Sequence, residues 1–431
     1  MHDNGNTAPL PTALRPHPLK NKLTMTVKPL LLLRVFIPFA AGYFLSYLYR
    51  TVNAVIAPNL VTDVGVGPAA LGMLTAVYFI SFASFQLPLG VLLDRFGPRR
   101  VEGVLLVFAA LGAALFAKAE SLASLALGRA GIGFGVSACL MAAFKAYTLW
   151  IPRDKWPMIN GLQMAAGGLG ALAATSPVEM ALRITDWRGV FLGLSVLTFF
   201  IAGCVLYVVP EKDGERNEES LGHQLRGIRE VFTSRIFWRT APLTTISQAT
   251  FMAIQGLWAG PWLTHIGGLS RPEVAKMLFA VALAMVAGFV TLGGLAERLS
   301  RRGTKVSTTA VAGMTIFMMI QLLLLFHPPG FTLILWLSFG FFGTSGVIAY
   351  SALSQSFPIH LSGRVTTALN LLVFVAAFCC QWAIGAIIDL WSKGDGQVFN
   401  ATGFNAAFIL LLLLELAGLL YYLYSARKER T

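Results

Sequence analysis

An arginine lies deep inside an apolar stretch of the chain, in the segment YFLSYLYRTVNAVIAP. Tyr43, Tyr47 and Arg50 follow one another at i, i+4 and i+7, so a helix places two phenols and a guanidinium on one face. A guanidinium binds carboxylate or phosphate through paired hydrogen bonds. We therefore expect Arg50 to anchor an anionic group; the alternative is a structural arginine that bonds carbonyls or reaches the membrane surface.

A second polar stripe occurs in the other half of the chain. Gln248 and Gln255 are spaced seven residues apart with Met252 between them, and Trp258 follows in QGLWAGPWL. Two amides and an indole on one stripe suit hydrogen bonding and stacking with a polar organic solute. The glycines and the proline of this segment indicate that the helix bends there. For each glutamine alone, a bond that joins two helices is the alternative.

The composition around these residues is that of a membrane protein. The 431 residues are 56% hydrophobic and 12% charged, whereas soluble proteins carry about 25% charged residues. Apolar runs of about 20 residues, the length that crosses a bilayer, follow one another from Leu30 to Tyr424. We expect a polytopic membrane protein.

Apolar runs bounded by proline, glycine and charge predict twelve transmembrane helices. In lipid each backbone group must be satisfied within its own segment, which favours helices. The expected spans are 31–57, 69–93, 100–117, 122–148, 158–181, 188–209, 239–263, 273–296, 305–326, 331–356, 365–389 and 404–424. Because the count is even, both termini lie on one side.

The distribution of Lys and Arg predicts the orientation. The loops on the side of the termini hold most of these residues. The opposite side keeps only Lys118, Arg183, Arg188, Arg271, Lys276 and Lys393. Because cytoplasmic loops are enriched in Lys and Arg, we expect cytoplasmic termini in a plasma membrane, which is the inner membrane in a Gram-negative cell. The same bias accounts for the net charge of +13 without a nucleic-acid partner.

The longest internal hydrophilic stretch divides the chain in two. Residues 210–238 separate a six-helix block at 30–209 from a second at 239–424. Apolar residues at helical spacing in the second part of this linker predict an amphipathic helix on the cytoplasmic surface. Residues 1–29 are polar, with no visible signal peptide, and together with 425–431 we expect them to be cytoplasmic tails, the first one disordered.

A charged motif occurs at the same place in each block. GVLLDRFGPRR and GGLAERLSRR both have a glycine four residues before an acid, then an arginine at once, then a basic pair. The residues concerned are Gly90, Asp94, Arg95, Arg99 and Arg100 in the first block and Gly293, Glu297, Arg298, Arg301 and Arg302 in the second. Such a repeat indicates a duplicated six-helix unit, and two such bundles around a cavity are the architecture of a rocking carrier.

On these features the chain resembles the major facilitator superfamily. A further motif, LALGRAGIGFG at 125–135, is similar to the family's arginine-containing motif on helix four through Leu125, Arg129, Gly133 and Gly135. The resemblance implies an all-α membrane protein with 12 transmembrane helices in two pseudo-symmetric six-helix bundles. It also implies a secondary active transporter that works by alternating access, without catalytic residues, cofactor or metal.

The resemblance assigns the motif a role in conformational switching, carried in the first block by Gly90, Asp94, Arg95, Arg99 and Arg100 and in the second by Gly293, Glu297 and Arg298. It implies that Gly90 packs against helix eleven and that Asp94 faces the N-terminal end of that helix near Thr366 and Thr367. A carboxylate there is stabilised by ~0.3–1 kcal/mol. A contact that exists in one state only biases the equilibrium between the two states. Arg129 is then structural or part of proton coupling.

Three further ionisable residues are candidates for structural or coupling roles. Lys145 near the end of helix four is either a cation of the adjoining loop or the lip of the cavity. Glu179 is expected to pair with Arg183, four residues later, at the outer rim. Glu415 interrupts FILLLLLELAGLL, where a helix–helix contact is favoured over a proton site.

The substrate is narrowed by comparison within the superfamily. Segment SYLYRTVNAVIAPNL is similar to helix one of the organophosphate exchangers, but Thr51 stands where they have a second cation. A dianionic phosphate held by one arginine is poorly neutralised in a cavity of low dielectric. We therefore expect a small organic anion, in particular a carboxylate, moved together with protons by a monomer. A drug/proton antiporter and an organophosphate exchanger are the alternatives.

Other function classes find little support in the residues. No Ser/His/Asp constellation, phosphate loop or metal-ligand spacing occurs, which argues against an enzyme. Met314 and Met318 have a spacing that soft metals accept, yet methionine stripes are typical of packing, so copper transport is disfavoured. The four cysteines lie inside apolar runs and predict no disulfide framework.

Overall fold

The computed structural model describes residues 29–151, 156–211, 227, 229–326, 330–358, 361–392 and 399–428, and these residues are almost entirely helical, with no strand among them. The expected N-terminal tail lies outside the described residues except for Pro29, as do residues 212–226 of the linker and the last three residues of the chain. Of the predicted amphipathic helix, Val231 is described and is fully buried in a small cluster with Phe237, Leu353 and Leu369.

The helices of the N-terminal half form six spans. They are α1 (Pro29–Thr51), α2 (Asn53–Val64), α3 (Pro68–Ser84), α4 (Gln86–Ala117), α5 (Leu122–Gly135), α6 (Cys139–Trp150), α7 (Trp156–Ala173), α8 (Ser176–Ala181) and α9 (Trp187–Tyr207). Helix α4 completes the second span and, after a turn at Gly97, forms the third. Gly97 has φ 77°, a left-handed conformation that glycine adopts at no steric cost, and Pro98 restarts the helix.

The C-terminal half repeats this arrangement. Its elements are α11 (Arg235–Ala253), η2 (Ile254–Trp258), α12 (Ala259–His265), α13 (Arg271–Arg301), α14 (Val306–Leu325), α15 (Thr332–Phe342), η3 (Gly343–Ser345), α16 (Gly346–Gln355), α17 (Ser362–Ser392) and α18 (Ala401–Lys428). The charged motif at the end of α13 is followed by Gly303 at φ 90°, whereas in the first copy the left-handed glycine, Gly97, lies inside the motif before its basic pair. The twelve predicted spans are thereby confirmed.

Several spans are interrupted partway across. Among the described residues, eight helical segments are long and apolar enough to cross a bilayer unaided. In other spans the helix changes register, as at the break between α7 and α8 and at the π-helical turn η2, which lies where a bend was predicted beside Gly256. Such irregular backbone is tolerated at membrane depth where protein surrounds it.

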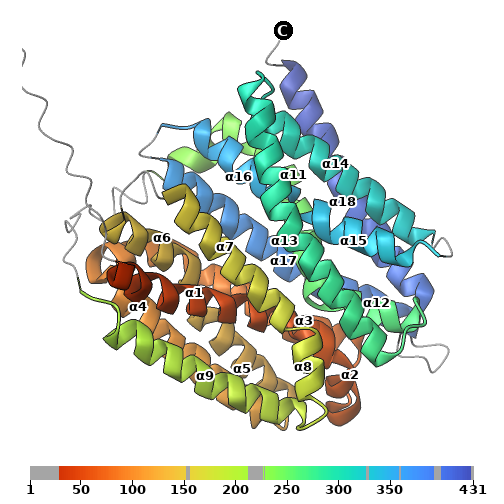
Figure 1. Cartoon of the computed structure of the whole chain (residues 1–431). Helices are drawn as coiled ribbons and strands as arrows, with labels where there is room; N and C mark the ends of the chain where they lie inside the picture. Colours follow the sequence, from red (N-terminus) through yellow and green to blue (C-terminus); the bar gives the residue numbers. More distant parts are fainter. Residues whose placement is uncertain are drawn as a thin grey trace, which may run out of the picture.

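The two halves meet along a long interface. Figure 1 shows α1 to α9 grouped together in red to yellow-green and α11 to α18 grouped beside them in green to blue. Helix α3 of the first half runs against α17 of the second, and α7 lies beside α13. Functional side chains are held between these helices.

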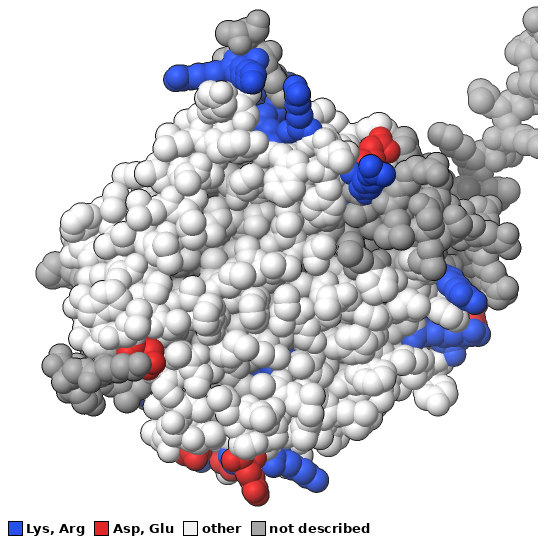
Figure 2. Space-filling model, turned by 180° about the vertical axis from the view of Figure 1, so that it is seen from behind, with Lys and Arg blue, Asp and Glu red and all other residues white. Residues whose placement is uncertain are grey.

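The surface agrees with a position in lipid. Figure 2 shows a broad region with almost no Lys, Arg, Asp or Glu, with charged side chains gathered toward opposite margins. Large apolar side chains such as Phe200, Val290 and Leu413 are exposed. A soluble protein would bury them, whereas lipid tails solvate them.

Candidate functional site

A cavity of about 330 Å³ lies between the two halves. Helix α1 contributes Tyr43, Tyr47 and Arg50 to its wall, which confirms that these three side chains share a face. Helices α11 and α17 supply most of the opposite wall, including Gln248 and Asn370. The rest of the lining is mainly aromatic and aliphatic, as is usual for a small-molecule site.

Arg50 is held in the cavity by aromatic rings. Its guanidinium carbon lies 4.5 Å from the ring centre of Tyr47, 5.2 Å from that of Phe374 and 5.8 Å from that of Phe82. The last two rings come from different halves and stack on each other at 4.0 Å. Cation–π contacts stabilise the charge without neutralising it. Among the described residues no carboxylate forms an ion pair with Arg50, and its Nε has no hydrogen-bond partner.

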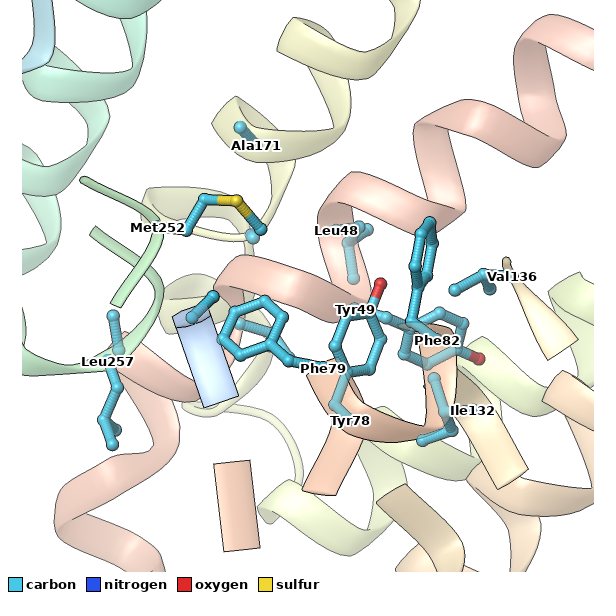
Figure 3. Packing of buried hydrophobic residues seen from close by; sticks show 14 of the residues in the cluster. Leu48, Tyr49, Tyr78, Phe79, Phe82, Ile132, Val136, Ala171, Met252 and Leu257 are labelled. Atoms are coloured by element: carbon cyan, nitrogen blue, oxygen red, sulfur yellow. The ribbon is translucent and has the colours of Figure 1, made fainter. Parts of the chain in front are cut away.

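A second arginine binds the backbone of α1 at the residue before Arg50. Arg129 of α5 is fully buried and donates through Nη1 to the carbonyl of Tyr49, 3.2 Å away. Tyr49 in turn bonds Thr198 of α9 through its hydroxyl at 2.9 Å. Figure 3 shows Tyr49, Tyr78 and Phe82 close together in the packed interior. Arg129 therefore positions the turn of α1 that presents Arg50, in keeping with the structural role expected for it.

An amide bridge across the cavity was not predicted. Asn370 of α17 donates through Nδ2 to Oε1 of Gln86 on α4 at 3.3 Å, and the hydroxyl of Tyr350 approaches Oδ1 of Asn370 at 3.5 Å. Gln86 also donates to the carbonyl of Ser137 at 3.2 Å. In the sequence, Gln86 and Asn370 are recognisable as single amides within apolar helices. Helical periodicity does not show that these two side chains face each other between the two halves.

The two predicted glutamines line the cavity while making local bonds. Gln248 donates through Nε2 to the carbonyl of Gly343 at 2.9 Å, and Gln255 lies 3.6 Å from the sulfur of Met285. Each retains a carbonyl oxygen for other partners. Both the binding and the helix-joining expectations are thus compatible with their geometry.

The prediction that Trp258 lines the cavity is wrong. Trp258 is fully buried in the π-helical turn, and its Nε1 donates to the carbonyl of Gln381 on α17 at 3.2 Å. Its ring lies beside Gly72 of α3 and Gly385 of α17. A π-turn contains one more residue than a regular α-helical turn, so a side chain at its end, such as that of Trp258, departs from the stripe that regular α-helical spacing implies.

Polar contacts join the halves at one end of the cavity, here called the Arg271 end. Nε of Arg271 on α13 lies 2.9 Å from a carboxylate oxygen of Glu179 on α8, and its Nη2 donates to Asn59 of α2 at 2.6 Å. The expected pairing of Glu179 with Arg183 is therefore wrong. The break before α8 turns Glu179 toward the other half, where Arg271 meets it.

The first charged motif lies on the surface. Gly90 has open space where a side chain would be, so its expected close packing against helix eleven is wrong. Arg99 donates to the carbonyl of Leu206 at 2.7 Å, and Arg100 forms an ion pair with Glu211. Arg95 is exposed. The side chain of Asp94 lies outside the described residues, so its expected contact near Thr366 and Thr367 stays a prediction.

The second copy of the motif is also exposed. Glu297 pairs with Arg301 one turn later at 2.6 Å, within α13. Gly293 has open space around it, and Arg298 points outward. Neither motif contributes to the cavity wall.

Two further candidates lie away from the cavity. Lys145 is partly exposed and follows Phe144, which lines the cavity. Glu415 on α18 is fully buried and accepts a hydrogen bond from Nε2 of Gln321 on α14 at 2.8 Å. This is the helix–helix contact that was favoured for Glu415. Met314 is packed among apolar residues such as Leu243 and Leu292, in keeping with the packing role expected of it.

Comparison with known proteins agrees with this architecture. The family model described as Major Facilitator Superfamily matches residues 39–380. Among solved structures, a bacterial homologue of the human lysosomal transporter Spinster, in an inward-facing and unoccupied conformation, is similar with a TM-score of 0.75 at 15% identity, covering 93% of this chain and 98% of that one.

Two sequence relatives span most of the chain. The hexuronate transporter of Escherichia coli strain K12 is 22% identical over 401 residues, covering 88% of this chain and 90% of its own length. The probable sulfoacetate transporter of Cupriavidus necator is 24% identical over 346 residues, covering 75% of this chain and 78% of its own.

Proposed function

The chain belongs to the Major Facilitator Superfamily of membrane transporters, and from that premise we propose that it moves a small organic anion, in particular a carboxylate, by proton-coupled alternating access. The observation that carries this proposal is the guanidinium of Arg50, which lies in a cavity between the two halves and forms no ion pair with a carboxylate of the described residues. An arginine that lacks a carboxylate partner inside the protein attracts an anion from outside it.

The cavity favours a singly charged head group over a dianion. Beyond Arg50, the polar groups that line it are neutral hydroxyls and amides such as Tyr43, Ser46 and Gln248. One guanidinium balances one carboxylate or sulfonate, whereas a second negative charge stays uncompensated at low dielectric. The relative named for hexuronate is named for a solute with a single carboxylate. Sulfoacetate, in the name of the other relative, carries a carboxylate and a sulfonate and is therefore a dianion, so only the first name supports this preference.

Hydroxyl and amide groups suit the rest of a polar solute. Tyr350, Ser351 and Asn370 lie on the wall opposite α1, within the same cavity. They offer both donors and acceptors to a hydroxylated acid. The stacked rings beside Arg50 exclude water around the charged contact, which strengthens it.

The membrane setting completes the proposal. The chain is a multi-pass membrane protein, and we assign both termini to the cytoplasm of a plasma membrane because Lys and Arg concentrate in the loops on that side. The transporter works as a monomer, since the cavity is built from the two halves of a single chain. Protons supply the driving force.

The test is uptake by the purified protein in proteoliposomes. D-glucuronate, sulfoacetate, glycerol 3-phosphate and the cationic dye ethidium are offered to wild type, Arg50→Ala and Arg50→Lys. We expect uptake of an organic acid with a KM that rises about 10- to 100-fold in Arg50→Ala, because a hydrogen bond to a charged group contributes about 1.5–3 kcal/mol. Arg50→Lys should recover part of this loss.

Arg235→Ala is the matched control, because Arg235 is an exposed arginine at the start of α11. Uptake in this variant should equal wild type. Transport of an organic acid by Arg50→Ala with an unchanged KM contradicts the role of Arg50. Transport of ethidium instead of the acids identifies a drug carrier.

A further inference from the structure

A carboxyl group is buried beside the cavity and was not singled out by the sequence. Glu102 on α4 is fully buried, and in the part of the chain that the structure describes no nitrogen or oxygen donor forms a hydrogen bond with its carboxyl, whose polar neighbour is the thiol of Cys139. It differs in this from Glu179, which is paired with Arg271, and from Glu415, which is bonded to Gln321. A charged carboxylate in such a place is costly unless it is paired.

The structure makes room for this carboxyl. One of its oxygens lies against Gly42 of α1, in the space that a side chain at that position would fill. The aliphatic side chain of Leu106 lies on the same side. A glycine at this point therefore lets the acid reach into the contact between α1 and α4.

Glu102 lies one side chain behind the cavity wall. The thiol of Cys139 on α6 lies beside the carboxyl and is itself close enough to interact with Tyr43 and Arg50. Tyr43 and Arg50 line the cavity, as does Leu140, the residue after Cys139. A change in the charge of Glu102 therefore changes the electrostatic potential in the cavity, where the anion is expected to bind.

The groups around Glu102 leave its charge uncompensated. From α6 it faces Cys139 and, farther along the helix, Tyr147, whose hydroxyl is engaged with Gln163 at 2.7 Å. From α9, the apolar Leu206 packs on Gly103. On α1 and α5 the cations are Arg50 and Arg129, and neither forms an ion pair with Glu102 among the described residues.

We propose that Glu102 is the proton-binding group that couples substrate movement to the proton gradient; this rests on the proposed function. The carboxylate takes up one proton and becomes a neutral acid, which removes a negative charge near the cavity. An anion then meets the field of Arg50 without that opposing charge, so proton and anion favour each other's binding. Such coupling is reciprocal, which makes the carrier a symporter.

Glu102→Gln mimics the protonated state, and Glu415→Gln is the matched control in the other half. With D-glucuronate as the probe, wild type should bind more tightly as the pH falls. Glu102→Gln should bind tightly at every pH and exchange glucuronate at equal pH, but lose accumulation driven by a pH gradient. Glu415→Gln and Glu102→Asp should keep the gradient response. A gradient response in Glu102→Gln equal to that of wild type overturns the proposal.

A second measurement tests Glu102 without any substrate. Infrared difference spectra between acidic and alkaline pH should contain a carboxylic acid band that is absent in Glu102→Gln and shifted in Glu102→Asp. Spectra identical to wild type in both variants refute proton binding at Glu102. Failure of wild type to transport any organic acid refutes the proposed function alone, whereas pH-independent acid transport refutes the proton role alone.

Discussion

Three buried ionisable side chains, Arg50, Arg129 and Glu415, are accommodated by different kinds of contact. Arg50 is surrounded by the rings of Tyr47, Phe82 and Phe374, while Arg129 donates to a backbone carbonyl. Glu415 accepts from an amide. Rings and carbonyls leave the net charge of an arginine available to a ligand, whereas an ion pair would cancel it. The environment of Arg50 thus favours binding of an anion over a purely structural role.

The Gln321–Glu415 bond makes a prediction about stability. Gln321→Leu leaves the carboxyl of Glu415 without its donor between α14 and α18. We expect the free energy of unfolding to fall by ~1–3 kcal/mol, the cost of an unsatisfied buried polar group. Thermal unfolding of the detergent-solubilised protein measures the change.

The double variant Gln321→Leu/Glu415→Leu is the control for this prediction. Replacing both partners by apolar residues removes the unsatisfied group, so stability should return most of the way to wild type. Equal loss in the single and the double variant would show that packing, and not the hydrogen bond, determines the stability of this contact.

At the scale of elements, glycines set how closely α7 approaches its neighbours. Gly170 faces the backbone of Phe44 on α1, and Gly168 faces Val286 of α13 in the other half. Gly167 lies against the rings of Tyr43 and Tyr47. Small residues allow close helix packing in membranes, where lipid supplies no hydrophobic force between helices. The close packing of α7 against α1 therefore fixes the positions of the Tyr43 and Tyr47 rings.

Gly170→Ala is expected to destabilise the protein because the new methyl group meets the backbone of Phe44. Overpacking of this kind costs about 1–3 kcal/mol. Gly193→Ala on α9 is the matched control, since nothing lies within 4 Å of the added carbon. Unfolding temperatures of the two variants test the difference, and equal temperatures would mean that α7 shifts at no cost.

At the scale of the whole molecule, the contact of Arg271 with Glu179 and Asn59 joins the two halves. Gly260 of α12 packs on the backbone of Ala54 at the same end. These contacts must separate if the cavity is to open there. They are therefore candidates for stabilising the conformation seen here over its alternative.

Arg271→Ala should shift the conformational equilibrium toward opening at the Arg271 end. The ion pair is partly exposed, with relative accessibilities of 39% and 9% for the two side chains. A contribution of about 1 kcal/mol is expected for such a pair, which is about fivefold in population. Distances between spin labels on α2 and α13 report the shift.

Arg235→Ala is the control for this shift, because Arg235 is exposed at the start of α11 and takes no part in the Arg271 contact. The distance distribution should not change in this variant. An unchanged distribution in Arg271→Ala as well would assign the stability of the closed end to backbone packing, as at Gly260.

The sequence by itself determined the span count, the duplication and the face that Tyr43, Tyr47 and Arg50 share. These features depend on local periodicity and on repeated spacing. Both can be recognised in the sequence without knowing which helices pack against one another. The same reasoning failed for Trp258, because the π-turn shifts the register. It failed for Glu179, because an ion pair is chosen by proximity in space.

Only the tertiary structure decided which faces meet. Gln86 and Asn370 are far apart in the chain and come together across the cavity. In the sequence, Glu102 is one of several charged residues near a helix end. Its burial without an ion-pair partner depends on the packing of α1 and α6 against α4. Helical periodicity fixes the direction of a side chain relative to its own helix axis. The rotation and approach of neighbouring helices depend on packing between distant segments, which no local pattern encodes.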